Sequence, residues 1–195
     1  MKKSLLALLL ITTIAMGQGL RVFTGLSIPL GDFGDVYKST MQYGGSYTMK
    51  MPGIEPPPGA ELITEYLIGY AKYQGDTDSF ITMREYTMIP LIANGILDMN
   101  PSAKDFGGLA PNLLLGIGYY LGTNSWTMES DYLALTYNDS EAYVGINIGG
   151  GADYYFNKHA LLTATAKYHY MMSMSEYDTG SMSLFDIRLG AGFSF

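Results

Sequence analysis

The chain contains no cysteine and little charge. Without cysteine, a disulfide-stabilised fold and a zinc or iron–sulfur site with cysteine ligands are both excluded. Charged residues make up 15% of the 195 residues, whereas about a quarter is usual for soluble domains. The 11 Lys and Arg against 18 Asp and Glu give a net charge of −7, which repels phosphate and argues against nucleic-acid binding. So little charge is hard to reconcile with a surface that faces water on every side.

Long hydrophobic runs are also missing, except at the N-terminus. Lys2 and Lys3 precede an apolar stretch over residues 5–16, which is too short for the roughly 20 residues of a membrane-spanning helix. Small residues follow at the positions that a signal peptidase reads. We therefore expect a Sec-type signal peptide over residues 1–17, with cleavage after Gly19 as the alternative. The mature domain is expected over residues 18–195.

After the signal peptide, no segment is apolar for long enough to cross a membrane as a helix, and helical patterns are weak. Lipid satisfies no backbone hydrogen bonds, so a mature chain in a membrane must form a closed β-barrel. Because no cysteine follows the signal peptide, lipid attachment to an N-terminal cysteine is excluded.

Glycine and tyrosine are abundant, and the sequence alternates between apolar and polar residues. In the last segment Phe185, Ile187 and Leu189 alternate with Asp186, Arg188 and Gly190, as in a strand with two different faces. Proline donates no ladder hydrogen bond, so we expect a bulge or an irregular stretch near Pro90. The alternation predicts an all-β protein, an eight-stranded antiparallel up-and-down transmembrane β-barrel, with strands over residues 20–30, 41–51, 61–73, 80–97, 113–121, 141–156, 162–172 and 184–195.

The predicted connections alternate in character. The first, third, fifth and seventh are polar and mostly long, and the sixth, residues 157–159, is very short. The second, residues 52–59, is rich in proline and is expected to be stiff. Outer-membrane barrels have short turns at one end and long loops at the other. The expected loops at the long-loop end are residues 31–40, 75–79, 122–140 and 173–182.

Three features predict that the apolar face points outward to lipid. The polar faces hold small residues and charges of both signs, which suit a narrow eight-stranded interior. Aromatic residues gather near the predicted strand ends, as in the girdles at membrane interfaces. The low charge is also natural for a wall that faces lipid.

Several stretches resemble the small outer-membrane β-barrel domain family of OmpA-, OmpX- and OmpW-type proteins. They are residues 141–156 (EAYVGINIGGGADYYF), 160–170 (ALLTATAKYHY) and 184–195 (LFDIRLGAGFSF), with weaker likeness in 86–91 (YTMIPL), 113–120 (LLLGIGYY) and 25–34 (GLSIPLGDFG). The resemblance implies location in the outer membrane and insertion by the barrel-assembly machinery, which in this family reads the aromatic C-terminal strand. Ala191, Phe193 and Phe195 match that pattern.

The charges on the polar faces are the first set of candidate site residues. Buried charges must be paired, so we predict a network of salt bridges that plugs the barrel. An eight-stranded barrel has room for side chains and little more, which argues against a permanent aqueous pore. The predicted members of this lumen network are Arg21, Glu65, Glu141, Asp153, Lys167, Asp186 and Arg188, with Lys50 as a further cation.

Other residues with chemical potential have simpler interpretations. His169, followed by Ser173 and Glu176, allows a lipid-modifying enzyme in which histidine activates serine, but a lumen hydrogen bond explains His169 more simply. His159 is expected in a solvated turn. Met171, Met172, Met174 and Met182 suit apolar packing better than Cu(I) binding, and Asp76 with Asp78 falls far short of a Ca²⁺ site. No cofactor is predicted.

The sequence therefore favours a non-enzymatic, monomeric outer-membrane barrel with a role in surface interaction or envelope integrity. Trp126, Tyr132 and Tyr137 in the predicted loop 122–140 are the candidate contact residues for an extracellular ligand, or they cap the barrel mouth. The alternative is transport of a small hydrophobic molecule. Transport requires an apolar pocket at the mouth, formed by Tyr120, Tyr143 and Leu184.

Overall fold

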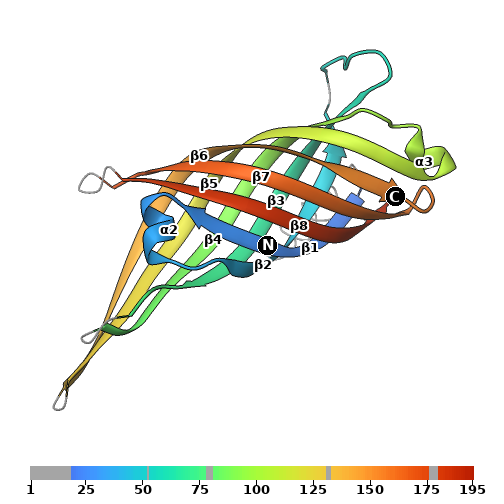
Figure 1. The fold of residues 1–195 in the computed structure, drawn as a ribbon. Coiled ribbons are helices and arrows are strands. Elements are labelled where there is room, and N and C mark those ends of the chain that lie inside the picture. The colour runs from blue at the N-terminus through green and yellow to red at the C-terminus, as the bar shows by residue number, and fades with distance from the viewer. Residues whose placement is uncertain (1–18, 52, 78–80, 131–132, 176–179) are drawn as a thin grey trace, which may run out of the picture.

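The structure is a computed structural model that describes residues 19–51, 53–77, 81–130, 133–175 and 180–195. The predicted signal peptide lies outside these ranges. Eight antiparallel strands follow one another around a closed barrel, so the predicted fold is confirmed (Figure 1). The strands are β1 (Gly19–Leu30), β2 (Thr40–Lys50), β3 (Glu61–Gln74), β4 (Ile81–Asp98), β5 (Gly108–Ser130), β6 (Leu133–Tyr155), β7 (Ala160–Ser173) and β8 (Ser181–Ser194).

The first and last strands close the barrel. β1 pairs with β8 over its whole length, from Gly19 opposite Ser194 to Leu30 opposite Ser183. Both described chain ends therefore lie at one end of the barrel, which we call the terminal end. The connections between β1 and β2, β3 and β4, β5 and β6, and β7 and β8 lie at the opposite end, which we call the loop end.

The alternation along each strand places apolar side chains on the outside and the polar and charged side chains inside, where they are mixed with apolar ones. Val22, Leu115, Ile117 and Leu189 on the outer wall are 63–68% exposed, whereas Arg188 on the inner side is 3% exposed. Because successive side chains point to opposite faces of a strand, this sorting follows directly from the period of two in the sequence.

The prediction of a loop at the fifth connection is wrong. Residues 122–140 were expected to form a polar loop, but β5 and β6 continue as a paired hairpin from Thr123 opposite Ser140 to Ser130 opposite Leu133. Threonine, tyrosine, tryptophan and leucine in this segment suit strands, and cross-strand pairs such as Trp126 with Tyr137 hold it together. The polar residues of this segment still alternate with apolar ones, and a period of two indicates strands rather than a loop.

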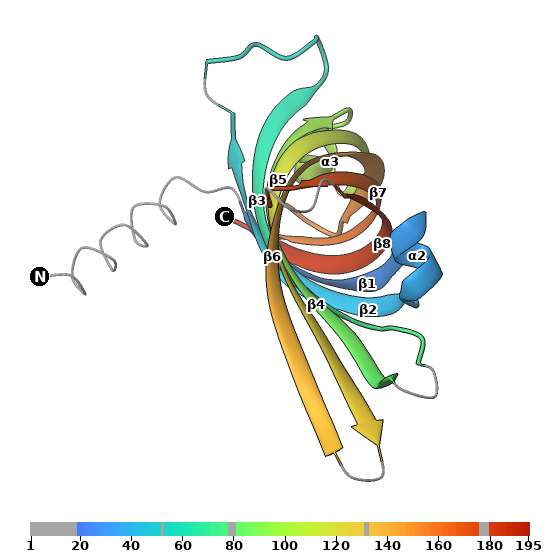
Figure 2. The ribbon, with the colours of Figure 1, turned by 90° about the vertical axis from the view of Figure 1, so that its left-hand side faces the viewer.

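This hairpin and the start of β4 form a sheet that extends beyond the barrel (Figure 2). We call residues 83–85, 123–130 and 133–140 the protruding sheet. In the barrel the inward positions hold polar and charged residues mixed with apolar ones, and in the protruding sheet they carry Trp126, Met128, Leu135 and Tyr137. The outward positions of the protruding sheet carry mostly Ser, Thr, Asn and Glu. The outer face of β5 and β6 therefore changes from apolar to polar where these strands leave the barrel.

Pro90 interrupts one ladder without a bulge. Between β3 and β4 the pairing runs to Ile68 opposite Leu91 and resumes at Ala71 opposite Met88, with the register unchanged. A register shift occurs instead between Ile81 and Met83, on the β5 side of β4. The predicted irregularity at Pro90 is thus a gap in pairing, because proline has no N–H to donate.

Two short helices lie at the two ends of the barrel (Figure 1). α2 (Asp32–Val36) follows β1 at the loop end, after a turn at Gly31 with a φ of 60°, a value that favours glycine. α3 (Ala103–Phe106) joins β4 to β5 at the terminal end. Among the described residues, no helix is long and apolar enough to cross a membrane.

Candidate functional site

The barrel interior brings together charges from strands that are far apart in sequence. Arg21 on β1 donates to Asp153 on β6, with Nη2 2.7 Å from Oδ2 and Nη1 3.4 Å from Oδ1. The two side chains are 7% and 4% exposed. A two-pronged contact of this kind is the geometry in which arginine binds a carboxylate best.

Glu65 on β3 lies at the centre of a second group. Its carboxylate accepts hydrogen bonds from Ser46 Oγ and Asn94 Nδ2, each at 2.7 Å, and it is 3.3 Å from Lys167 Nζ. Lys167 is 2% exposed. A fully buried lysine requires a partner of this kind, because burial of an unpaired charge is costly.

A third group surrounds Asp186 on β8. Arg188 Nη2 donates to Asp186 Oδ2 at 2.5 Å, and Ser27 Oγ donates to Oδ1 at 2.6 Å. His169 Nε2 lies 3.1 Å from Oδ2, while Nδ1 of the same ring is 2.8 Å from the Tyr120 hydroxyl. Asp186 therefore connects side chains from β1, β7 and β8.

Arg188 has two further contacts that fix its orientation. Its Nε donates to Gln42 Oε1 at 3.1 Å, and its guanidinium lies 4.8 Å from the centre of the Phe23 ring. The carboxylate that pairs with Arg188 is Asp186 of the same strand.

Two members of the predicted network lie elsewhere. Lys50 is at the terminal rim, where it pairs with Glu61 at 2.9 Å and its side chain is 67% exposed. Glu141 faces inward near the loop end, where it accepts hydrogen bonds from the hydroxyls of Tyr143 at 2.5 Å and Tyr86 at 3.3 Å. Neither residue belongs to the central groups around Asp153, Glu65 and Asp186.

The predicted network left out several neutral polar residues of the interior. Asn94, Asn112 and Asn147 are 1–4% exposed, and Ser27 is 1% exposed. Asn94 lies on β4, where the confused alternation near Pro90 hid its inward position. A count of inward positions back from Asp98, which is also buried, would have found it.

Aromatic side chains fill the loop end of the interior. The Phe33 ring of α2 lies 4.7 Å from Tyr37, 5.1 Å from Tyr86 and 5.4 Å from Tyr73, measured between ring centres. Glycine makes room here, since a Cβ at Gly122 would overlap the Tyr86 hydroxyl. The same buried cluster contains Tyr120, Tyr143 and Leu184, the residues expected to form an open apolar pocket.

The terminal end is covered by α3. Ala103 packs with Ala110, Tyr155 and Leu161. Lys104 binds Glu61, which Lys50 also contacts from the rim. Burial alone would raise the pKa of Glu61, but hydrogen bonds from Lys104 and Lys50 bring it below its usual value.

Cavities between these groups are small. One, lined by Arg21, Glu65 and Lys167 among others, measures about 20 Å³, and one beside His169 and Asp186 measures about 10 Å³. A single water molecule needs roughly 10–15 Å³ on this measure. These spaces are too small for an organic molecule.

Within the described part of the chain, the interior does not assemble the serine–histidine pair of an enzyme. Both ring nitrogens of His169 face Tyr120 and Asp186 rather than Ser173, and Glu176 lies outside the described residues. The lumen hydrogen bond expected for His169 is what the structure shows. His159 lies in the turn before β7, as expected, and stacks on Phe193 with ring centres 5.5 Å apart.

The four methionines near the last loop do not converge on one point. Met171 and Met182 are buried at 0% and 7% exposure, while Met172 and Met174 are 51% and 55% exposed. This arrangement fits apolar packing. Among the described residues, no group of three or more His, Asp or Glu is placed to hold a metal ion. Asp76 pairs with Lys38 at 2.8 Å, and Asp78 lies outside the described residues.

The remaining candidate residues lie outside the charge groups of the barrel interior. Trp126 and Tyr137 are neighbours on the protruding sheet, with ring centres 5.2 Å apart, while Tyr132 lies outside the described residues. On β8, Ala191 and Phe193 point outward, and Phe193 lies 6.1 Å from Phe195.

Comparisons with known proteins place the fold among small outer-membrane barrels. Neither the family models nor the curated proteins give a match. The outer-membrane protein OprG from Pseudomonas aeruginosa is 14% identical, with a TM-score of 0.56 over 92% of this chain and 97% of that one. A major outer-membrane protein from Thermus thermophilus is 13% identical, with a TM-score of 0.54 over 90% and 99%. Neisserial surface protein A is 11% identical, with a TM-score of 0.50 over 91% and 96%. At these identities the likeness is one of fold, and at that level it confirms the resemblance expected from the sequence.

Proposed function

We propose that this protein is a monomeric outer-membrane barrel with a closed interior, whose function is contact at the cell surface through the protruding sheet. The observation that carries the proposal is the change of polarity along the outer face of β5 and β6. This face is apolar up to Leu121 and polar from Thr123 onward. A strand with this pattern leaves lipid at about Thr123 and continues into water.

The orientation in the membrane follows from the same reasoning. The protruding sheet and α2 lie at the loop end, which we place outside the cell, and the chain ends lie in the periplasm. Aromatic residues on the outer wall support a membrane band between the two ends. Tyr43, Tyr70 and Tyr119 lie towards the loop end, and Tyr154 and Phe193 lie towards the terminal end.

A closed interior argues against conduction and transport. Ion pairs occupy the middle of the barrel, and the aromatic cluster around Phe33 occupies the loop end. In planar bilayers we expect no stable conductance from the purified protein. A large, persistent conductance would refute the closed interior and favour transport as the function.

The protruding sheet offers a contact surface with two useful properties. Its inner face exposes Leu133 at 57%, Leu135 at 52% and Tyr137 at 50%. β6 also presents a strand edge that β7 does not cover, because the pairing of β6 with β7 ends at Tyr143 in the part of the chain that the structure describes. Exposed apolar faces and uncovered strand edges are both features of protein-binding surfaces.

The test begins with location. Membrane fractionation should place the protein in the outer membrane, and its gel mobility should change only on boiling, as expected of a folded barrel. The surface role is then tested by deletion of residues 124–139, which shortens the hairpin without reaching the barrel. Loss of binding to host-cell or neighbouring-cell surfaces, with unchanged heat-modifiable mobility, is the expected result. Unchanged binding would exclude the protruding sheet as the contact surface.

A further inference from the structure

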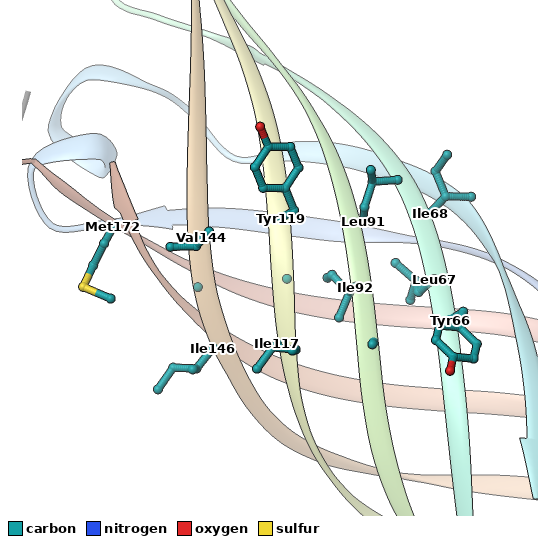
Figure 3. Close-up of a pocket in the computed structure, with 13 residues that line it drawn as sticks. Tyr66, Leu67, Ile68, Leu91, Ile92, Ile117, Tyr119, Val144, Ile146 and Met172 are labelled. Carbon is teal, nitrogen blue, oxygen red and sulfur yellow. The ribbon is translucent and has the colours of Figure 1, made fainter. Parts of the chain in front are cut away.

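The outer wall of the barrel carries a groove of about 840 Å³ that crosses five strands, β3 to β7 (Figure 3). A barrel wall is normally convex. Here β4, β5 and β6 curve away from the barrel towards the protruding sheet (Figure 2). The groove lies at the foot of this curve. The most exposed lining residue is Ile117, at 68%.

The groove is built from two neighbouring rows of paired outward residues. The upper row runs from Ile68 through Leu91 and Tyr119 to Val144 and Met172. The lower row runs from Tyr66 through Ala93 and Ile117 to Ile146. Among the described residues, none that lines the groove is charged, so its surface suits hydrocarbon rather than a polar ligand.

Polar side chains form another row on the same strands, closer to the loop end. Lys72 pairs with Thr87, Thr87 with Thr123, and Thr123 with Ser140. This row is four residues above the upper row of the groove, about 13 Å along a strand. Lys72 is within reach of Glu85 at 2.8 Å, but its side chain remains 45% exposed.

We propose that the groove binds the acyl chains of an outer-leaflet lipid, and that the row from Lys72 to Ser140 binds its phosphate-bearing headgroup. This inference rests on the proposed location in the outer membrane. An apolar hollow below a lysine and three hydroxyls has the polarity of a lipid, with hydrocarbon at one end and phosphate and hydroxyl acceptors and donors at the other. Flexible acyl chains can follow a curved hollow closely, and an unfilled hollow would forfeit dispersion contacts along its lining.

A second copy of the chain is the main competing occupant. The strands of another barrel are stiff, and its apolar wall would leave the lysine and the hydroxyls without a polar ligand. Lipid matches both the groove and the row above it, and for that reason we commit to lipid.

The proposal is tested by native mass spectrometry of the full mature barrel, reconstituted in vesicles of phosphatidylethanolamine and phosphatidylglycerol and released in mild detergent. Ile117→Trp fills the groove with a larger side chain. Leu189→Trp is the matched control, because Leu189 is also an outward residue, 63% exposed, but lies on β8 away from the groove. We expect wild type and Leu189→Trp to retain lipid, and Ile117→Trp to retain about tenfold less, the change for a loss of about 1.4 kcal/mol in binding.

The headgroup row is tested with a second pair of variants, which also serves if Ile117→Trp fails to fold. Lys72→Gln should retain less phosphatidylglycerol relative to phosphatidylethanolamine. Lys38 lies in the loop after α2 and pairs with Asp76, so Lys38→Gln removes a lysine outside the row and should leave the ratio of the two lipids unchanged.

Each contrary result has a distinct meaning. Equal lipid retention in all correctly folded variants overturns the proposal. A wild-type dimer that becomes monomeric in Ile117→Trp also overturns it, and assigns the groove to a second copy. If the protein is absent from the outer-membrane fraction, the proposed function fails first, and the lipid experiment is not needed to show it.

Discussion

The ion pair of Arg21 and Asp153 gives the most direct test of how the barrel interior is stabilised. Replacement of Arg21 by methionine keeps most of the side-chain volume but removes both hydrogen bonds that Asp153 receives from it. Asp153 is only 4% exposed, so water cannot replace those bonds. Breaking a buried pair on one side costs about 3–5 kcal/mol, because a charge stays buried without compensation.

The double variant separates the two explanations for that loss. In Arg21→Met with Asp153→Leu, no charge is left alone, and replacement of a buried pair by apolar residues of similar volume is often close to neutral. We therefore expect the double variant to recover most of the stability lost in the single variant. Lys167→Met should cost less than Arg21→Met, because Glu65 keeps the hydrogen bonds from Ser46 and Asn94.

The measurement is guanidinium unfolding in detergent micelles, followed by circular dichroism, with heat-modifiable gel mobility as an independent measure of folding. For a chain of this length, about 3–5 kcal/mol corresponds to a loss of roughly 6–20 °C in the midpoint of thermal unfolding. If Arg21→Met lies within about 1 kcal/mol of wild type, the pair does not carry the stability assigned to it. If the double variant is as unstable as the single one, packing rather than charge explains the loss.

Three further predictions concern the wall, the glycines and the terminal rim. Leu115→Arg on the apolar outer wall, which we propose faces lipid, should destabilise the barrel by about 2–4 kcal/mol, whereas Asn138→Arg on the polar side of the protruding sheet should change stability little; equal losses in guanidinium unfolding would contradict the proposed membrane boundary. Gly122→Leu should cost about 1–3 kcal/mol, since its side chain would overlap the Tyr86 hydroxyl, and a variant as stable as wild type would show that the aromatic cluster is loosely packed. Because the folded-state pKa of Glu61 is lowered from 4.5, its contribution should be complete at neutral pH and should decline as the pH falls below about 4.5. The pH dependence of unfolding in Glu61→Gln should be flatter in that range, and an unchanged profile would exclude Glu61 as its source.

Particular residues show how far the sequence alone could reach. The inward positions of Arg21, Lys167 and Asp186 follow from the alternation along their strands, because every second residue of a strand faces the same side. The lumen hydrogen bond of His169 is expected for the same reason. By contrast, the polarity of the segment that includes Trp126 and Tyr137 predicts a loop, which is wrong. The alternation continues through this segment with its apolar residues in the inward phase, so a search that follows the outward apolar residues of the preceding strand ends at Leu121.

The partners of the buried charges could not be derived in the same way. Arg21 meets Asp153, which is 132 residues away in sequence, and Arg188 meets Asp186, which is two residues away. The alternation places all four side chains inward but does not assign partners. The choice depends on the stagger between strands around the closed barrel, and stagger is not encoded in any one strand.

The sequence by itself determined that the chain is a barrel with an apolar outside and with charged and polar residues inside, because side-chain alternation is a local property that is repeated in every strand. It also determined that charges would be buried, because their residues occupy the inward phase. Only the tertiary structure decided which charges pair, how far β5 and β6 extend past the barrel, and that Phe33 from α2 packs into the loop end. Each of these depends on how elements that are separate in sequence lie relative to one another in space.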